Sequence, residues 1–402
     1  MPGRAKAAEP FELMDGERVV LLGNTLIERD QKYGYLETAL TSRWPDRNIT
    51  FRNLGWSGDT VWGDARAGFD NAEKGFERLK ELVLANKPTT IFVSYGTNEA
   101  FAGEKGLPEF QKGLDRLLDA ISESKARIVI ISPIKQAPMR SPLPNPDAHN
   151  EQLKLYCEAL RNAAEKRGTR YVDLFQNSAS NIRSPHGNMT DDGLHLTPDG
   201  YFRFAEAIES QLQLPPFGRD IEIQSDGKVT VSKGTLVEKI QGTPKSGAVS
   251  FVLRDERLPS CPWAGETTGF GMSIVLKGLP PGNYLLRIDG NDVETGSADN
   301  WSRGISRHSG KVSVAHPEHT QIEKLRAAIN AKNQLYFYRW RPQNETYLFG
   351  FRKHEQGKNA AEVVQFDPLI AEKEAEIAKL RVPQPHVYEL VREPDEKKNE
   401  NK

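Results

Sequence analysis

Between Arg18 and about Leu214, short apolar segments alternate with longer amphipathic ones, and this alternation restricts the fold more than any other feature of the sequence. The apolar segments are rich in β-branched residues and are typical of strands: 18–23 (RVVLLG), 49–55 (ITFRNLG), 89–96 (TTIFVSYG), 127–133 (RIVIISP) and 170–175 (RYVDLF). Helical segments lie between them, among them 76–86, 107–124 and 151–167. Apolar strands separated by helices predict an α/β fold, a parallel sheet covered on both faces. Ligands bind such sheets outside the carboxyl ends of the strands.

The rest of the 402-residue chain predicts further units. Residues 1–16 form an N-terminal arm and 17–215 the α/β domain. In residues 216–316, apolar and polar residues alternate with period two, and Gly, Pro, Asn and Asp interrupt these runs. This pattern predicts an antiparallel β-sandwich module. Residues 317–382 predict a C-terminal helical segment, and 383–402 a charged, disordered tail. The aromatic and arginine-rich stretch Tyr336–Gly357 either reaches the cleft of the α/β domain or is a purely structural clamp.

Charge and cysteine content exclude several classes of function. The formal net charge is −1, with 54 Lys and Arg against 55 Asp and Glu. A chain so close to neutral is not expected to bind nucleic acid by electrostatic attraction. No apolar run is long enough for a membrane span. Cys157 and Cys261 form no CxxC pair, so a zinc cage is excluded, while one disulfide stays possible. No metal and no organic cofactor is expected, and the oligomeric state stays open.

The N-terminal residues bear on the compartment. Ala5-Lys6-Ala7 has the small-x-small spacing at which signal peptidases cut. The protein is periplasmic or secreted if these residues are the remnant of such a site, and cytoplasmic otherwise.

The first two of four unusual loops follow the first two strands. Gly23-Asn24-Thr25 places the Thr25 hydroxyl at the N-terminus of a helix, where it is either a nucleophile or an N-cap. The loop 53–66 (NLGWSGDTVWGDAR) contains Gly58, whose amide can approach a developing oxyanion closely. The alternative for this loop is an ordinary glycine-rich turn.

The other two loops supply polar and titratable side chains. In 93–101 (VSYGTNEAF), the Asn98 side-chain amide either donates to the same oxyanion or satisfies its own backbone. In 190–201 (TDDGLHLTPDGY), Asp192 precedes His195 by three residues and can orient its ring for proton transfer. The alternative is a surface salt bridge. Because all four loops leave one sheet at the same edge, the set predicts an acyl-transfer site.

These blocks resemble those of the SGNH/GDSL hydrolase family, esterases with a flavodoxin-like three-layer α/β/α domain. The family blocks are Gly-Asp-Ser, the glycine of Ser-Gly-Asp-Thr, Gly-x-Asn-Asp and Asp-x-x-His. This chain has GNT at 23–25, SGDT at 57–60, GTNE at 96–99 and DGLH at 192–195. The resemblance covers about residues 17–215.

The resemblance implies a role for each matching residue. His195 would be the general base and Asp192 its orienting carboxylate, while Gly58, Asn98 and the Thr25 amide would form the oxyanion hole. Thr25 stands where the family has its nucleophilic serine. A threonine hydroxyl can transfer acyl groups when a base activates it, although its methyl group crowds the site. The competing hypothesis is a catalytically silent glycan-binding pseudo-hydrolase.

The substrate class is predicted from aromatic residues and from the resemblance. Trp56, Trp62 and Tyr95 lie close in sequence to the Gly58 and Asn98 loops and could stack on sugar rings or pack in the core. Asn24 and Glu99, which depart from the family blocks, are further candidates for substrate binding. Together with the family's chemistry, these residues predict hydrolysis of a small, acetyl-type ester of a small molecule or a glycan.

Overall fold

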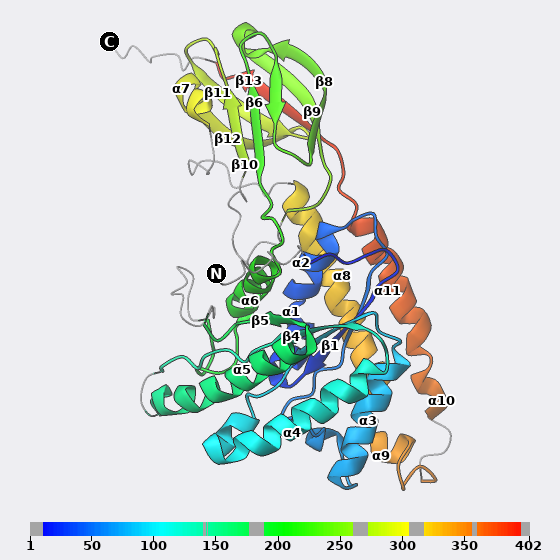
Figure 1. Cartoon of the computed structure of the whole chain (residues 1–402). Helices are drawn as coiled ribbons and strands as arrows, with labels where there is room; N and C mark the ends of the chain where they lie inside the picture. The colour runs from blue at the N-terminus through cyan, green and yellow to red at the C-terminus, as the bar shows by residue number, and fades with distance from the viewer. Residues whose placement is uncertain are drawn as a thin grey trace. The chain divides into compact units, whose positions relative to one another are not determined.

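The computed structural model describes residues 11–139, 142, 144–176, 189–259, 272–304, 317–355 and 360–394. The chain divides into two compact units (Figure 1). The first unit comprises Met1–Ala39, Asp46–Pro215 and Arg326–Ile377, and the second comprises Leu40–Pro45, Pro216–Leu325 and Ala378–Lys402. Each unit therefore combines segments that are far apart in the sequence. The Ala5-Lys6-Ala7 motif lies outside the described residues.

A five-stranded parallel sheet forms the centre of the first unit. Its strands are β1 (Arg18–Gly23), β2 (Thr50–Asn53), β3 (Thr90–Ser94), β4 (Arg127–Ile131) and β5 (Arg170–Val172). Their order is β2-β1-β3-β4-β5, with Val19 beside both Phe51 and Thr90. This is the flavodoxin-like order, in which the crossover leaves a crevice at the carboxyl ends of β1 and β3. The predicted strands and fold class are confirmed.

Helices cover both faces of this sheet (Figure 1). They are α1 (Thr25–Tyr33), α2 (Tyr35–Arg43), α3 (Ala72–Ala85), α4 (Gly103–Ser122), α5 (Asp147–Arg167) and α6 (Pro198–Gln211), with 3-10 turns η1 (Asp64–Arg66) and η2 (Glu99–Ala102). On one face, alternate strand residues such as Val20, Val93 and Ile130 pack in one cluster with residues of α3, α4 and α5. On the other face α1 meets α6, where Tyr33 stacks on Tyr201 with ring centroids 4.9 Å apart.

The C-terminal helices α8 (Pro317–Trp340), α9 (Glu345–Leu348), α10 (Ala360–Val363) and α11 (Phe366–Leu380) contribute to the first unit from Arg326 to Ile377. Lys332 of α8 is buried, and its ammonium lies 2.6 Å from the Glu37 carboxylate and 3.1 Å from the Phe51 carbonyl oxygen. Asn333 donates to the other Glu37 oxygen at 3.0 Å. A buried ion pair thus fixes α8 to the α/β core, and the helical segment is part of that core.

The second unit is a β-sandwich. Its smaller sheet has the order β10-β6-β7 and the larger one β12-β11-β13-β9-β8. The strands are β6 (Arg219–Ile223), β7 (Val229–Val231), β8 (Thr235–Thr243), β9 (Ala248–Asp255), β10 (Met272–Leu276), β11 (Asn283–Ile288), β12 (Asn291–Ser297) and β13 (His386–Arg392), with η4 (Pro244–Ser246) and α7 (Ala298–Arg303) between strands. Residues of both sheets, including Ile221, Ile274, Phe251 and Tyr388, share one apolar cluster.

Two expectations about this unit are corrected. The module was expected to be antiparallel, but β10 pairs with β6 in parallel. Residues 383–402 were expected to be a disordered tail, yet His386–Arg392 forms β13, the central strand of the larger sheet between β11 and β9. The sequence HVYELVR alternates buried and less buried positions with period two, and the charged residues that follow it hid this signal. Cys157 is a free, buried thiol, and Cys261 lies outside the described residues.

The buried pair of α8 generates a stability prediction. Lys332→Met is expected to lower the free energy of unfolding by about 3–5 kcal/mol, because the Glu37 carboxylate is left buried without a cation. Urea unfolding measures this loss, and adding Glu37→Gln is expected to restore part of it. The control is Lys373→Met. The Lys373 ammonium lies 2.7 Å from the Glu376 carboxylate at a partly exposed site, and such an ion pair contributes less than about 1 kcal/mol to stability. Equal small losses for both variants would contradict the anchoring role of Lys332.

Candidate active site

The turn after β1 places Thr25 at the start of α1. Asn24 is the N-cap residue, since its Oδ1 accepts a hydrogen bond from the Leu26 amide at 3.3 Å. The alternative role of Thr25 as the N-cap is therefore wrong. Thr25 is the first residue of the helix and is half-buried. Because the first amides of a helix have no acceptor within the helix, the Thr25 N–H is free of intrahelical bonding.

The loop after β2 lies against the start of α1. A Cβ added to Gly55 would lie 2.2 Å from the Glu28 nitrogen, so only glycine permits this approach. Gly58 has a φ of +78°, a backbone conformation that favours glycine. Its amide donates to Thr25 Oγ1 at 3.4 Å. The backbone donor that the sequence predicted at Gly58 thus faces the predicted nucleophile.

Side chains from the loop after β3 fix the glycine loop. Asn98 Nδ2 donates to the Asp59 carbonyl oxygen at 2.7 Å. The Glu99 carboxylate accepts the amides of Val61 and Gly96, each at 2.9 Å. Burial raises the Glu99 pKa to about 7, although these amides lower it. Glu99 therefore joins the two loops rather than lining the pocket.

A buried ion pair, which the sequence did not predict, lies under the same loops. Asp59 and Arg66 are both fully buried, with Arg66 Nε 2.7 Å from Asp59 Oδ2. The Tyr95 hydroxyl donates to the same carboxylate oxygen at 2.9 Å, and Arg66 also donates to the Leu54 carbonyl oxygen at 2.8 Å. The only signal in the sequence was a pair of opposite charges, seven residues apart, in a glycine-rich loop.

The loop before α6 holds His195. Its Nδ1 lies 2.6 Å from Asp192 Oδ2, while Asp192 Oδ1 accepts the amides of His195 at 2.8 Å and Leu194 at 3.0 Å. Burial alone would raise the Asp192 pKa, but the hydrogen bonds from His195 and Leu194 lower it to about 2. A carboxylate that stays ionised at neutral pH thus fixes the ring and favours a proton on Nδ1.

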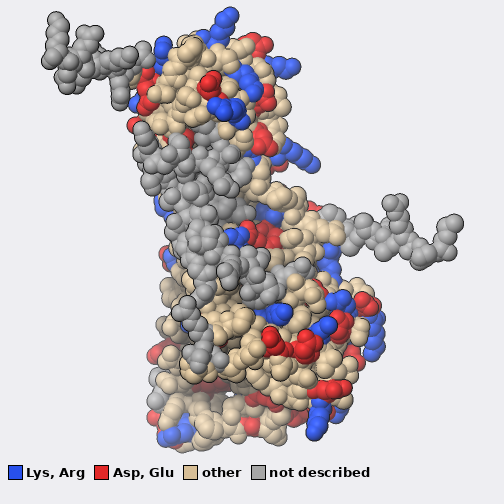
Figure 2. All heavy atoms as spheres, turned by 90° about the vertical axis from the view of Figure 1, so that its left-hand side faces the viewer, with Lys and Arg blue, Asp and Glu red and all other residues tan. Residues whose placement is uncertain are grey.

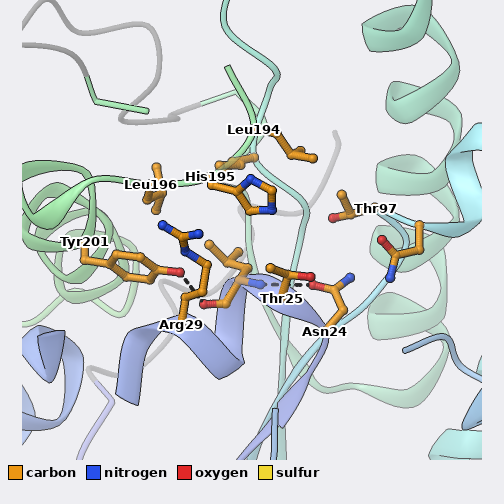
Figure 3. A pocket seen from close by; sticks show the side chains of 11 residues that line it. Asn24, Thr25, Arg29, Thr97, Leu194, His195, Leu196 and Tyr201 are labelled. Carbon is orange, nitrogen blue, oxygen red and sulfur yellow. Dashed lines mark hydrogen bonds between the residues drawn. The ribbon is translucent and has the colours of Figure 1, made fainter. Parts of the chain in front are cut away.

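One small pocket, of about 30 Å³, brings the loops together (Figure 3). It is lined by Asn24, Thr25, Leu26, Arg29, Thr97, Asn98, Ile134, Leu194, His195, Leu196 and Tyr201. The His195 ring and the Thr25 side chain both face this space. Within the described part of the chain, no hydrogen bond joins Thr25 Oγ1 to the ring. Arg29 pairs with Asp191 at 3.0 Å, and the Tyr201 hydroxyl donates to the Leu26 carbonyl oxygen at 2.9 Å.

The three predicted aromatic contacts do not line this pocket. Tyr95 is fully buried, so the expectation of a sugar-stacking ring is wrong for it. Trp62 packs on α4, where a Cβ added to Gly113 would lie 2.6 Å from its ring. The Arg341 guanidinium stacks over the Trp56 ring, with its central carbon 3.7 Å from the ring centroid. The sequence shows which residues flank the loops, but not which way their rings turn.

The stretch Tyr336–Gly357 reaches the glycine loop. Arg341 lies 2.8 Å from Glu28 Oε2, the same oxygen that accepts the Ser57 amide at 2.6 Å. Arg339 instead pairs with Asp367 at 2.7 Å. The contact supports the loop from outside, since Arg341 does not line the pocket.

Basic and acidic side chains are mixed on the surface drawn in Figure 2, where Lys and Arg are interspersed with Asp and Glu. Among the described residues, no group of three His, Cys, Asp or Glu side chains lies close enough together to hold a metal ion. No helix within the described ranges combines the length and the apolar character needed to cross a bilayer.

Comparisons with known proteins agree with this fold. Residues 23–203 match the model of the GDSL-like Lipase/Acylhydrolase family. A gut microbial diltiazem-metabolizing enzyme is similar over 95% of this chain and 99% of its own, with a TM-score of 0.72 and 16% identity. Axe2, an acetylxylan esterase from Geobacillus stearothermophilus, covers 51% of this chain and 98% of its own, with a TM-score of 0.41 and 18% identity. The curated proteins contain no match to the sequence.

The raised pKa of Glu99 predicts a pH-dependent stability. Between pH 4.5 and about 7, the unfolded chain releases the Glu99 proton while the folded protein keeps it. The free energy of unfolding therefore falls as the pH rises through this window, by roughly 3 kcal/mol at about 1.4 kcal/mol for each pKa unit.

Urea unfolding of wild type and Glu99→Gln from pH 4 to 8 measures this effect. The free energy of unfolding of the wild type is expected to fall relative to that of Glu99→Gln as the pH rises, because glutamine does not ionise. Glu77→Gln, on the partly exposed side of α3, is the control and is expected to follow the wild type. Parallel curves for all three proteins would contradict the assignment.

Proposed function

We propose that the protein is an esterase that hydrolyses a small acyl ester through an acyl-Thr25 intermediate. The observation that carries this proposal is the pocket in which Thr25, Asn98 and His195 meet, with the Gly58 amide directed at Thr25 Oγ1. The pairing of His195 with Asp192 leaves its Nε2 as the basic nitrogen. This set supplies a nucleophile, a base and oxyanion donors.

The reaction proceeds in two balanced steps. Thr25 Oγ1 attacks the acyl carbon as its proton passes to His195 Nε2, and the imidazolium then protonates the departing alcohol as the ester bond breaks. Water next attacks acyl-Thr25 and gives a proton to His195. The bond from Thr25 to the acyl group breaks, Oγ1 recovers the proton, and the acid leaves. Asp192 stays ionised throughout and stabilises the imidazolium.

The oxyanion would be bound by backbone and side-chain donors. In the resting site the Gly58 amide donates to Thr25 Oγ1 at 3.4 Å, which is long for a hydrogen bond. When the negative charge develops on the acyl oxygen, three N–H groups can donate hydrogen bonds to that oxygen. They are the Gly58 amide, the Thr25 amide and the second N–H of the Asn98 side chain. Each such donor typically contributes about 10²–10³ in kcat.

The size of the pocket supports a small acyl group. The pocket beside Thr25 and His195 is small, with Ile134, Leu194 and Leu196 among the residues that line it, which favours a short acyl group. The alcohol part is less defined, because Tyr95 is buried and Trp62 packs on α4. Only Trp56, half-buried beside Arg341, remains of the rings expected to contact a sugar. The proposed substrate is therefore a small ester of a small molecule or a glycan.

Hydrolysis of aryl acetates tests the proposed nucleophile. Wild type is expected to turn over, while Thr25→Ala and His195→Ala are expected to lose at least about 10³ of kcat, because nucleophile and base act as a unit. Thr25→Ser is expected to raise kcat, since it removes the methyl group that crowds the intermediate. Mass spectrometry of the quenched wild type is expected to find the acetyl group on the peptide that contains Thr25.

One observation favours a second candidate function, a catalytically silent pocket that binds a glycan. Thr25 Oγ1 accepts from the Gly58 amide and makes no hydrogen bond to His195 in the described residues. If only Thr25→Ser hydrolyses the ester, threonine has silenced the site and binding is the better account. Activity of His195→Ala equal to that of wild type would instead reveal a contaminating esterase.

The pocket volume also predicts selectivity for acyl length. With aryl acetate, butyrate and hexanoate, kcat/KM is expected to fall at each step, because longer chains extend beyond the small pocket beside Thr25 and His195. Leu194→Ala is expected to reduce the difference in kcat/KM between acetate and butyrate, because it shortens a side chain that lines the pocket and so enlarges the pocket. Similar kcat/KM values for all three esters would contradict selection for a short acyl group by this pocket.

A further inference from the structure

A second and larger pocket of the first unit lies among its C-terminal helices, and we call it the α8–α11 pocket. Its walls come from the end of α8, from α9 and α10, and from Phe366 at the start of α11. None of its residues lines the pocket of Thr25 and His195. Its volume of about 390 Å³ falls within the range of about 300–1,000 Å³ that is usual for pockets that bind small molecules.

Two aromatic rings line the α8–α11 pocket. Tyr338 on α8 is 36% exposed, and Phe366 is half-buried. Their ring centroids are 6.0 Å apart, and the ring planes are inclined by 42°. The residues next to them in sequence, Arg339 and Asp367, form a bidentate pair with distances of 2.7 and 3.3 Å. Because a bidentate pair favours one geometry, it holds the end of α8 and the start of α11, and so the two rings, beside each other.

The polar side chains of this pocket are two amides and one carboxylate. Gln343 and Asn344 lie in the turn between α8 and α9, and Glu362 belongs to α10. Asn344 is the N-cap residue of α9, but its side chain makes no hydrogen bond to that helix. All three side chains are exposed, and within the described ranges none of them makes a hydrogen bond to the protein. Donors and acceptors are thus available to a ligand.

The charge of the lining opposes an anionic ligand. Glu362 is the only charged side chain among the described residues that line the pocket. Arg339 already pairs with Asp367 at 2.7 Å. Arg341 pairs with Glu28 at 2.8 Å. A phosphate or carboxylate in the pocket would therefore meet a like charge without a lining cation to balance it.

We propose that the α8–α11 pocket binds a neutral pyranose ring of a glycan. The C–H face of such a ring can pack on Tyr338 and Phe366, while its hydroxyl groups bond to the two amides and the carboxylate. A purely apolar ligand would instead remove those polar groups from water without giving them partners. The pocket holds no nucleophile paired with a base, so it binds the glycan without reacting with it.

Methyl NMR of the full chain locates glycan binding. Leu348 lines the α8–α11 pocket and Leu194 lines the pocket of Thr25, so their 13C-labelled methyl groups report on the two places separately. In leucine-labelled protein, their signals are identified by their absence from Leu348→Ile and Leu194→Ile. The probes are xylotetraose, cellotetraose, mannotetraose and laminaritetraose. At least one probe is expected to shift and saturate the Leu348 signals. Shifts of the Leu194 signals alone, or no saturable Leu348 shift with any probe, would overturn the proposal.

Tyr338→Ala tests the contribution of the ring. This variant is expected to raise the Kd of the best probe about tenfold or more, because an aromatic ring that packs on the ligand contributes on that scale. The matched control is Phe349→Ala, which removes a 52% exposed ring of the same segment that does not line the pocket. The control is expected to keep the wild-type Kd. Equal Kd values for Tyr338→Ala and wild type would contradict the assigned site.

The charge of the ligand gives a second readout. Tetragalacturonate, an anionic glycan of the same length, is expected to bind about two- to fivefold more weakly than the best neutral probe at low ionic strength. Glu362→Gln is expected to remove this difference, whereas Glu372→Gln, exposed on α11 outside the pocket, is expected to retain it. Tighter binding of tetragalacturonate than of every neutral probe would overturn the proposal. A Leu348 shift with tetramethylammonium but with no glycan would do the same, since it indicates a cation site.

Glycan binding in the α8–α11 pocket does not depend on ester hydrolysis. His195→Ala is expected to lose turnover of aryl acetate and to keep the Leu348 shifts. Tyr338→Ala is expected to keep the wild-type kcat/KM for aryl acetate while its glycan binding weakens. If wild type hydrolyses no ester but the Leu348 signals shift, the proposed hydrolysis fails and the glycan site stands. If the Leu348 signals do not move, the glycan site fails, whatever the activity.

Discussion

Asp59 and Arg66 meet inside the first unit with both side chains removed from solvent, and the geometry of the candidate site depends on this contact. The Asp59 carboxylate also accepts the Tyr95 hydroxyl at the end of β3, while its backbone oxygen accepts Asn98 Nδ2. One residue thus sets the distance between the loops that carry Gly58 and Asn98. Burying two charges is costly, and such a pair adds little net stability over apolar residues. Its value here is that it connects the loop that carries Gly58 with Tyr95, which follows β3.

The first turn of α1 is the second element on which the site depends. Gly55 lets the glycine loop approach the Glu28 nitrogen closely, and Arg341 approaches Glu28 from the C-terminal end of α8. The nucleophile candidate, its N-cap and a neighbouring loop therefore meet at one helix end. Since the crevice of a flavodoxin-like sheet opens beside the strand that feeds this helix, the architecture brings separate loops to one place without any of them being long.

The sequence predicted the central sheet and much of the site, because both depend on local patterns. Apolar β-branched runs mark the strands, and loops at their carboxyl ends must meet at one edge. The failures concern long-range partners and side-chain direction. β13 was missed because its pairing strands precede it by about one hundred residues or more, and the charged tail obscured its alternation. Tyr95 follows a buried strand, and whether its ring turns to the core or the cleft depends on Asp59. Lys332 is polar in any sequence pattern, and only the position of Glu37 explains its burial.

The position of β13 also affects how the chain folds during synthesis. The larger sheet of the second unit has this strand at its centre, between β11 and β9, and cannot pair completely until residue 392 has left the ribosome. The first unit likewise lacks α8 residues until Trp340 has been made, so the Glu37 carboxylate is without Lys332 for most of translation. Neither unit can finish folding before the other has been largely synthesised. The nascent chain therefore exposes apolar surface of both units for longer than a chain of two consecutive domains would.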